Sequence, residues 1–420
     1  MSHYRQLRAA LARKLASDGL VHLAGGTPIP RNHDVDYVFR QNSDFLYLTG
    51  VEEPGCHLVL DAKTRREVLF VPRIDNHHRV WEGHVPGPAE ARRLFRVDRV
   101  MYADELKGYL RGRRVVSPSR LRDALDDLRA CKTPAELELM TRANRISGAA
   151  HRAVMAAARP GMREYELQAV FEAECVRAGL RHLAYPSIVA AGANAAVLHY
   201  RRNDAVLRSG ELLLIDAGAE DRGYAADITR TFPVSGRFTR RQRDIYQVVL
   251  ETQKECIRRA RAGVNSADLH VASMRLIADG LKSLGLLTGS LDALVETGAV
   301  RLFYPHGLTH MLGLDVHDVT GGKRRVLPNP TKVPVRFVAK LEPGFVITME
   351  PGVYFIEALI KDPALRRRHR GAVDFQKAES FLDFGGVRIE DDVLIRAAGP
   401  ARNLTAVPKE IADVEAACAR

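Results

Sequence analysis

One segment of the chain gathers residue types that can bind metals or move protons. The segment Phe303–Asp318 reads FYPHGLTHMLGLDVHD and contains His306, His310, His317, Asp315 and Asp318. Its Pro and Gly residues disfavour a regular helix, and no Glu follows the first histidine as the zinc motif HExxH requires. With 15 histidines in 420 residues, some clustering is expected by chance. The segment therefore predicts a site only if other parts of the chain supply partners.

Four carboxylates stand in stretches that otherwise have the pattern of buried strands. They are Asp216 in ELLLID, Asp227 in YAADITRTF, Glu350 in GFVITME and Glu390 in GVRIEDDVLI. Strand interiors disfavour Asp and Glu, and a buried carboxylate is costly unless it is paired or binds a metal. For any one of them, a salt bridge or an exposed strand end is the simpler explanation. Four on neighbouring strands would repel one another unless cations lay between them.

These carboxylates and one histidine make a ligand set of four hard oxygens and one imidazole. Such a set suits Mn²⁺, Co²⁺ or Fe²⁺ and suits structural zinc poorly. Bridging carboxylates hold two ions about 3.5–4 Å apart in hydrolytic two-metal sites. Asp216 and Asp227 are eleven positions apart across a predicted hairpin, so they can face each other on paired strands.

The elements that must position these residues follow from the sequence pattern. Thr133, Pro134 and Glu136 form a capping box that begins a long helix toward Ala158. Residues 211–216 and 224–232 predict an antiparallel hairpin, and 344–350 and 386–395 predict later strands. Further helices are expected over residues 1–20, 164–178, 239–262 and 266–284. We therefore predict an α+β protein with a smaller α/β domain at 1–130, which has two strands within 57–71, and a catalytic domain at 131–420.

Composition excludes several classes of protein. The apolar fraction of 46% and the charged fraction of 27% are typical of soluble globular proteins, and no apolar run is long enough to span a bilayer. The net charge of +12 comes from short basic runs without interleaved aromatic residues, so we expect no specific nucleic-acid partner. Five scattered cysteines without a CxxC pair indicate free thiols, and with no secretory signal we expect a cytoplasmic protein.

The segments that carry the four carboxylates resemble a known family. IDAGAEDRGYAADITRTFP, PHGLTHMLGLDVHD, TMEPGVYF and GVRIEDDVLI are similar to the four signature segments of the pita-bread metallopeptidases, which include methionine aminopeptidase, aminopeptidase P and prolidase. FRQNSDFLYLTGVEEPGC, VWEGHVPG and the 40-residue spacing from Glu350 to Glu390 resemble the prolidases most strongly. The resemblance covers nearly the whole chain. It implies a C-terminal pita-bread fold and hydrolysis of the Xaa-Pro bond of dipeptides by a metal-bridging hydroxide.

The same resemblance implies roles for individual residues. The ligands of two divalent ions, with Mn²⁺ preferred over Co²⁺, Fe²⁺ or Zn²⁺, would be Asp216, Asp227, His310, Glu350 and Glu390. Asp227 and Glu390 would bridge the ions, and Glu350 would also manage the proton of the nucleophile. His306 and His317 would support catalysis, and the substrate would be bound by His199, Tyr185, Arg336 and Arg388. The lone Trp81 is expected in a core by default, whereas the resemblance places it near the site of a second subunit of a homodimer.

Some alternatives stay open at this stage. An aminopeptidase P would act on longer Xaa-Pro peptides, and closure of the site by Arg336 favours the dipeptidase instead. A non-catalytic pita-bread binding protein, or a metal-free hydrolase such as creatinase, is disfavoured because all five ligands are present. Thr309 stands where the family usually has Gly, which puts substrate preference in doubt more than metal binding.

Overall fold

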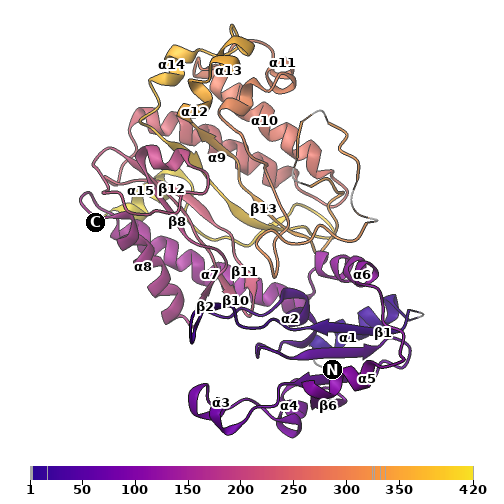
Figure 1. Cartoon of the computed structure of the whole chain (residues 1–420). Helices are drawn as coiled ribbons and strands as arrows, with labels where there is room; N and C mark the ends of the chain where they lie inside the picture. Colours follow the sequence, from indigo (N-terminus) through magenta and orange to yellow (C-terminus); the bar gives the residue numbers. More distant parts are fainter. Residues whose placement is uncertain are drawn as a thin grey trace. The chain divides into compact units, whose positions relative to one another are not determined.

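The computed structural model describes residues 3–16, 18–323, 325, 327–331, 333–335 and 337–419. The chain forms two compact units, one of residues 1–129 with 321–324 and one of residues 130–320 with 325–420. Each unit has its own sheets and helices (Figure 1). Within the described residues, no helix combines the length and apolarity that crossing a membrane would need.

The first unit is built on a four-stranded sheet in the order β1-β4-β5-β6. The two strands predicted within 57–71 are present as an antiparallel pair in which His57 lies opposite Phe70, and β6 adds to the sheet in parallel. The strands are β1 Leu20–Ala24, β2 Pro30–Asn32, β3 Val35–Asp36, β4 His57–Asp61, β5 Glu67–Val71 and β6 Arg99–Tyr102. The helices are α1 His3–Lys14, α2 Ser43–Thr49, α3 Asn76–Trp81, α4 Pro88–Phe95, α5 Leu106–Leu110 and α6 Pro118–Ala130.

Trp81 lies at the end of helix α3 and contradicts the expectation that it belongs to a core. Its side chain is 71% exposed, and the preceding Val80 is 80% exposed. Helix α3 has six residues and none of them is buried, so it presents no face to the unit's own interior. Within its own unit, Trp81 is therefore a surface residue.

The second unit begins with the predicted capping box. The Thr133 hydroxyl accepts a hydrogen bond from the Glu136 N–H, the Glu136 carboxylate accepts one from the Thr133 N–H, and Pro134 opens α7. The helices of this unit are α7 Pro134–Ala157, α8 Glu164–Arg177, α9 Arg240–Arg259, α10 Ser266–Ser283, α11 Leu291–Glu296, α12 Glu357–Ile360, α13 Pro363–Arg368, α14 Phe375–Glu379 and α15 Ile411–Cys418. The long helices α7 to α10 pack around the strands through one shared apolar core (Figure 1).

Short antiparallel strands carry the centre of the second unit. They form sheets in the orders β12-β9-β8, β11-β10-β7, β13-β16-β17 and β14-β15. The bounds are β7 His182–Leu183, β8 Ile188–Ala191, β9 Leu212–Asp216, β10 Ala219–Asp221, β11 Tyr224–Ala225, β12 Thr229–Pro233, β13 Val346–Met349, β14 Gly352–Tyr354, β15 Gly386–Arg388, β16 Asp391–Leu394 and β17 Arg402–Asn403. The predicted strand over 386–395 is thus interrupted at Ile389 and Glu390.

A buried histidine of α7 makes the second unit sensitive to acid. His151 is fully buried, its Nε2 lies 2.9 Å from the Ala217 carbonyl oxygen, and burial lowers its pKa from 6.5 to about 3. Between about pH 3 and pH 6.5, His151 is protonated in the unfolded chain and neutral in the folded chain. The free energy of unfolding therefore falls as the pH drops below 6.5.

We expect His151→Gln to remove this pH dependence, because the Gln amide can still donate to the Ala217 carbonyl but does not titrate. The difference in unfolding free energy between the metal-free parent and variant should shrink by about 2 kcal/mol from pH 7.5 to pH 5. Urea unfolding at both pH values measures it. A difference that stays constant between the two pH values would show that His151 contributes nothing to the acid sensitivity.

Candidate metal centre

The hairpin that carries Asp216 and Asp227 keeps one register from end to end. Asp216 lies opposite Thr229, and Asp221 lies opposite Tyr224 around a two-residue turn. Both turn residues, Arg222 and Gly223, have positive φ (49° and 84°), as a type I′ hairpin turn requires. The hairpin prediction is therefore confirmed.

We expected Asp216 and Asp227 to face each other across the hairpin. They are instead diagonal neighbours on one face of it. The register places Gly218 opposite Asp227, two positions beyond the Asp216–Thr229 pair. A Cβ at Gly218 would lie 1.8 Å from the Ala226 carbonyl oxygen, so only glycine allows the two chains to approach so closely. The approach brings both carboxylates to the same side of the hairpin.

Glu390 reaches the same place from the break between β15 and β16. Its backbone N–H donates to the Thr229 carbonyl oxygen at 3.0 Å, and its Oε2 accepts a hydrogen bond from the Thr229 hydroxyl at 2.6 Å. Glu390 is 2% exposed. Thr229 therefore fixes both the backbone and the carboxylate of Glu390 next to Asp227.

His310 and Glu350 enter from a second pair of segments. The His310 carbonyl accepts a hydrogen bond from the Thr348 N–H, and the Glu350 N–H donates to the Leu308 carbonyl. The Nδ1 of His310 lies 3.0 Å from the Met311 carbonyl oxygen, so its Nε2 is the nitrogen that faces the carboxylates. That Nε2 lies 3.5 Å from Oδ2 of Asp227 and 3.5 Å from Oε1 of Glu350.

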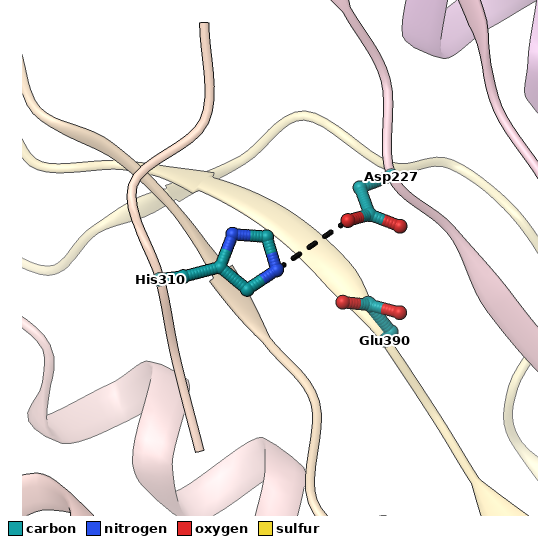
Figure 2. A group of neighbouring side chains, drawn as sticks. All are labelled: Asp227, His310 and Glu390. Atoms are coloured by element: carbon teal, nitrogen blue, oxygen red, sulfur yellow. Dashed lines mark ion pairs between the residues drawn. The ribbon is translucent and has the colours of Figure 1, made fainter. Parts of the chain in front are cut away.

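These side chains converge on one buried point within the second unit. Figure 2 shows Asp227, His310 and Glu390 directed toward one another, and each offers a ligand atom within 4.8 Å of the others. Burial, followed by repulsion from Asp227 and Glu350, raises the pKa of Glu390 well above its ordinary value. Burial also raises the pKa of Glu350 to about 7. The acids cannot all ionise together without a positive charge between them.

Asp216 joins the cluster through Arg388, which is buried on β15. The Arg388 Nη2 donates to Oδ2 of Asp216, and the Arg388 Nε lies 4.0 Å from Oε2 of Glu390. The other oxygen of Asp216, Oδ1, is buried and has no hydrogen-bond partner among the described residues. An unpaired carboxylate oxygen beside like-charged neighbours is the chemistry of a cation ligand.

Comparison with known proteins decides the family. The model of metallopeptidase family M24 matches residues 138–397, and the model of the aminopeptidase P N-terminal domain matches residues 4–116. The chain belongs to metallopeptidase family M24. Membership in this family implies divalent metal ions, and the donor set described above fits them.

Full-length relatives of this M24 chain include two kinds of Xaa-Pro peptidase. It is 36% identical over 437 residues to the Xaa-Pro dipeptidase of Homo sapiens, which covers 95% of this chain and 88% of the relative. It is 36% identical over 431 residues to a probable Xaa-Pro aminopeptidase of Sordaria macrospora, with 95% and 91% covered.

Solved structures confirm the predicted α+β pita-bread fold with its N-terminal domain. Zinc-substituted aminopeptidase P of E. coli in complex with product superposes with a TM-score of 0.85 at 33% identity, covering 100% of this chain and 98% of that one. Aminopeptidase PepP of Pseudomonas aeruginosa superposes with a TM-score of 0.86 at 34% identity, covering 99% and 97%.

Of the remaining predicted site residues, His317 and Tyr185 contact the cluster or its hairpin, and His199 lies close enough to His306 to contribute to the lowered pKa of that ring. The ring of the exposed His317 packs at 4.4 Å, centre to centre, against that of His310. The Tyr185 hydroxyl accepts a hydrogen bond from the Ile228 N–H at 3.4 Å, and His199 is exposed in the turn after Ala196. Arg336 lies outside the described residues.

His306 sits in a chain of hydrogen bonds that the sequence did not predict. Its Nε2 lies 2.8 Å from the Tyr354 hydroxyl, which accepts a hydrogen bond from Nη1 of Arg388 at 2.9 Å. Its Nδ1 lies 3.5 Å from Oε2 of Glu350. Burial, and then the charge of Arg388, lower the pKa of His306 to about 3, so the ring is neutral. Tyr354 thereby links a predicted catalytic residue to Arg388.

Two further residues escaped the sequence interpretation for different reasons. Thr229 could have been found, because it stands two positions after Asp227 and so shares its face of the strand. Tyr354 follows the EPG segment, but nothing in the sequence signals the partners of its hydroxyl. The hydroxyl of Thr309 is buried and has no hydrogen-bond partner among the described residues.

Proposed function

We propose that this M24 chain is a dipeptidase that hydrolyses the Xaa-Pro bond with two divalent metal ions. The observation that carries the proposal is the convergence of His310, Asp227, Glu350 and Glu390 in one buried cluster, with Asp216 joined to it through Arg388. The identity to the human Xaa-Pro dipeptidase over 95% of this chain supports the choice of substrate.

The five residues Asp216, Asp227, His310, Glu350 and Glu390 would hold the ions, with Asp227 and Glu390 shared between them. Mn²⁺ is the first choice, because carboxylate oxygens and one imidazole suit a hard divalent ion, and Co²⁺, Fe²⁺ or Zn²⁺ are the alternatives. When bound, the ions supply a nucleophile from water at neutral pH and polarise the substrate carbonyl.

Glu350 is the residue best placed to move protons. Its carboxylate lies 3.5 Å from both His310 and His306, within the cluster that would hold the ions. It can take a proton from the attacking water and pass it to the proline nitrogen, which leaves as an amine. His306, whose Nδ1 lies 2.8 Å from the Gly307 carbonyl oxygen and whose Nε2 is held by the Tyr354 hydroxyl, would support catalysis by holding the neighbouring Glu350 carboxylate in place.

The residues at the edge of the cluster would bind the substrate. His317 packs against His310 and reaches solvent, His199 is exposed, and Tyr185 is half-buried beside Ile228. They can meet a peptide that enters from solvent, and we assign His199 and Tyr185 to substrate binding and His317 to the support of catalysis. Arg336 would bind the dipeptide carboxylate, since a guanidinium fork suits a carboxylate.

A substrate-length series tests the choice of substrate. We expect Mn²⁺-loaded protein to cleave Gly-Pro and Ala-Pro at least ~10-fold more efficiently, as kcat/KM, than Gly-Pro-Ala and Ala-Pro-Ala. Burial of the dipeptide's carboxylate is lost when a further residue follows proline. Cleavage of the tripeptides alone would overturn the dipeptidase assignment.

A second candidate is an Xaa-Pro aminopeptidase that acts on longer peptides. It is supported by the superposition on E. coli aminopeptidase P over the whole chain and by the Sordaria relative. The 40-residue spacing from Glu350 to Glu390, which contains α12, α13 and α14, favours the dipeptidase because it resembles that of the prolidases.

We also propose a cytoplasmic homodimer. The five cysteines are free, as expected for a reducing compartment. The first unit exposes the large apolar side chains of Val38 and Trp81, at 82% and 71%, which a second copy could cover.

A further inference from the structure

The backbone N–H of Asp227 has no acceptor on its hairpin partner. The Ala217 N–H donates to the Ile228 carbonyl and the Ala226 N–H to the Ala219 carbonyl. Because hydrogen-bonded pairs alternate along an antiparallel ladder, the intervening Asp227 N–H points to the other side. There it donates to Oδ2 of Asp392 at 3.0 Å.

The position of strand β16 explains why the Asp392 side chain meets the Asp227 N–H. Thr229 and Glu390 form an antiparallel bridge, and the same register brings Asp392 opposite Asp227. Asp392 belongs to the strand that follows Glu390, and its carboxyl group takes the role that a backbone carbonyl would have in a regular ladder. Asp227, one proposed metal-bridging residue, is thus linked through its backbone to β16, the strand that directly follows the other, Glu390.

A closed ring of hydrogen bonds holds the Asp392 carboxyl group in place. The Asn144 Nδ2 donates to Oδ2 of Asp392 at 2.7 Å, and the Asn144 Oδ1 accepts from the Thr405 hydroxyl at 2.8 Å. The Thr405 Oγ1 in turn accepts from the Asp392 N–H at 3.0 Å. The ring joins α7, β16 and the segment after β17, so three separate parts of the chain fix one acceptor atom.

Stability alone does not account for this arrangement. Asp392 and Asn144 are fully buried, and Oδ1 of Asp392 has no hydrogen-bond partner among the described residues. A buried acid with one oxygen unpaired is costly, whereas an apolar side chain of the same shape would carry no such cost. What the acid provides is the acceptor for the Asp227 N–H.

We propose that Asp392 is a positioning residue, which orients the Asp227 carboxylate for metal binding by holding its backbone, and that Asn144 and Thr405 hold Asp392. The proposal rests on the function proposed above, because it concerns how a bridging ligand is aimed. Residues that hydrogen-bond to metal ligands typically change metal affinity or activity by about 10–100-fold when they are replaced.

Two variants of nearly the same shape distinguish the role of Asp392 as a hydrogen-bond acceptor from its role in packing. Asp392→Asn keeps one oxygen for Asn144 and the Asp227 N–H, and Asp392→Leu keeps the shape without an acceptor. We expect the dissociation constant of the metal-free protein for Mn²⁺, measured by calorimetry, to stay within about threefold of the parent in Asp392→Asn. In Asp392→Leu it should rise about 10–100-fold, with kcat for Gly-Pro lowered by a similar factor and KM changed by less than about threefold.

Three results would overturn the proposal. Unchanged Mn²⁺ affinity in folded Asp392→Leu would show a purely structural residue. Equal losses in Asp392→Asn and Asp392→Leu would show that the charge matters and the acceptor does not. Failure of the parent protein itself to bind Mn²⁺ would overturn the proposed function as well, so the two failures are distinguishable.

A second pair of variants serves if Asp392→Leu does not fold. Thr405→Val opens the ring and leaves the Asp392 carboxyl group intact, whereas Thr405→Ser keeps the hydroxyl. We expect Thr405→Val to weaken Mn²⁺ binding about three- to tenfold and Thr405→Ser to match the parent. Parent-like Mn²⁺ affinity in Thr405→Val would contradict the role of the ring.

Discussion

Asp227→Asn is expected to lower kcat/KM for Gly-Pro by about 10³-fold or more, equivalent to about 4 kcal/mol of lost transition-state stabilisation. The Asp227 carboxylate is buried, lies 3.5 Å from His310 Nε2 and has an oxygen within 4.8 Å of one of Glu390. An Asn side chain keeps the size but offers one neutral oxygen, so it cannot be shared between two cations. Steady-state hydrolysis with saturating Mn²⁺ measures the change.

A surface acid provides the control for this substitution. Asp413 is an exposed acid on α15, and Asp413→Asn should leave kcat/KM within about twofold of the parent. Circular dichroism of the metal-free proteins checks that all three chains are folded. Parent-like activity of Asp227→Asn would remove Asp227 from the metal centre and contradict the two-ion assignment.

Arg230→Met is expected to destabilise the second unit by about 3–5 kcal/mol. Arg230 is fully buried, and its Nη2 donates to Oδ1 of Asp391 at 2.6 Å. Its other N–H groups donate to the carbonyls of Thr229, Glu390, Val407 and Pro408. Replacement by Met leaves these carbonyls without a donor and leaves the buried Asp391 with Lys409 as its remaining cation. Urea unfolding of metal-free protein measures the loss.

An exposed ion pair of the first unit provides the comparison that isolates the effect of burial on stability. Arg73 and Asp104 lie 2.9 Å apart with side chains 56% and 57% exposed. Arg73→Met should therefore cost less than about 1 kcal/mol. If Arg230→Met cost no more than Arg73→Met, the buried network around Asp391 would not be a source of stability.

Local signals in the sequence were sufficient for the parts of the fold that depend on near neighbours. The Thr133–Glu136 capping box and the hairpin around Arg222 and Gly223 are formed by residues close in sequence, and both were predicted. Residue type alone favoured a core position for Trp81, whereas the resemblance placed it near a second subunit, and the side chain is exposed. Residue type gives a preference for burial and does not indicate which surface a second molecule covers.

The site was predictable as a set of residue types and not as a geometry. Asp216 and Asp227 stood out because acids are unusual in strands, but their diagonal placement depends on the register that Gly218 permits. Asn144 and Asp392 are 248 positions apart, and no local pattern indicates that they meet. The same holds for the Tyr354 hydroxyl, whose partners His306 and Arg388 come from two other segments.

Titration of chelated protein with Mn²⁺, with Gly-Pro hydrolysis measured at each ratio, tests the two-ion dipeptidase most directly. We predict no hydrolysis without metal and a rise to a plateau at two ions per chain, because the five ligands form one shared centre for two ions. Gly-Pro hydrolysis that persists at its full rate in excess chelator, or a plateau already reached at one ion per chain, would contradict the two-ion mechanism.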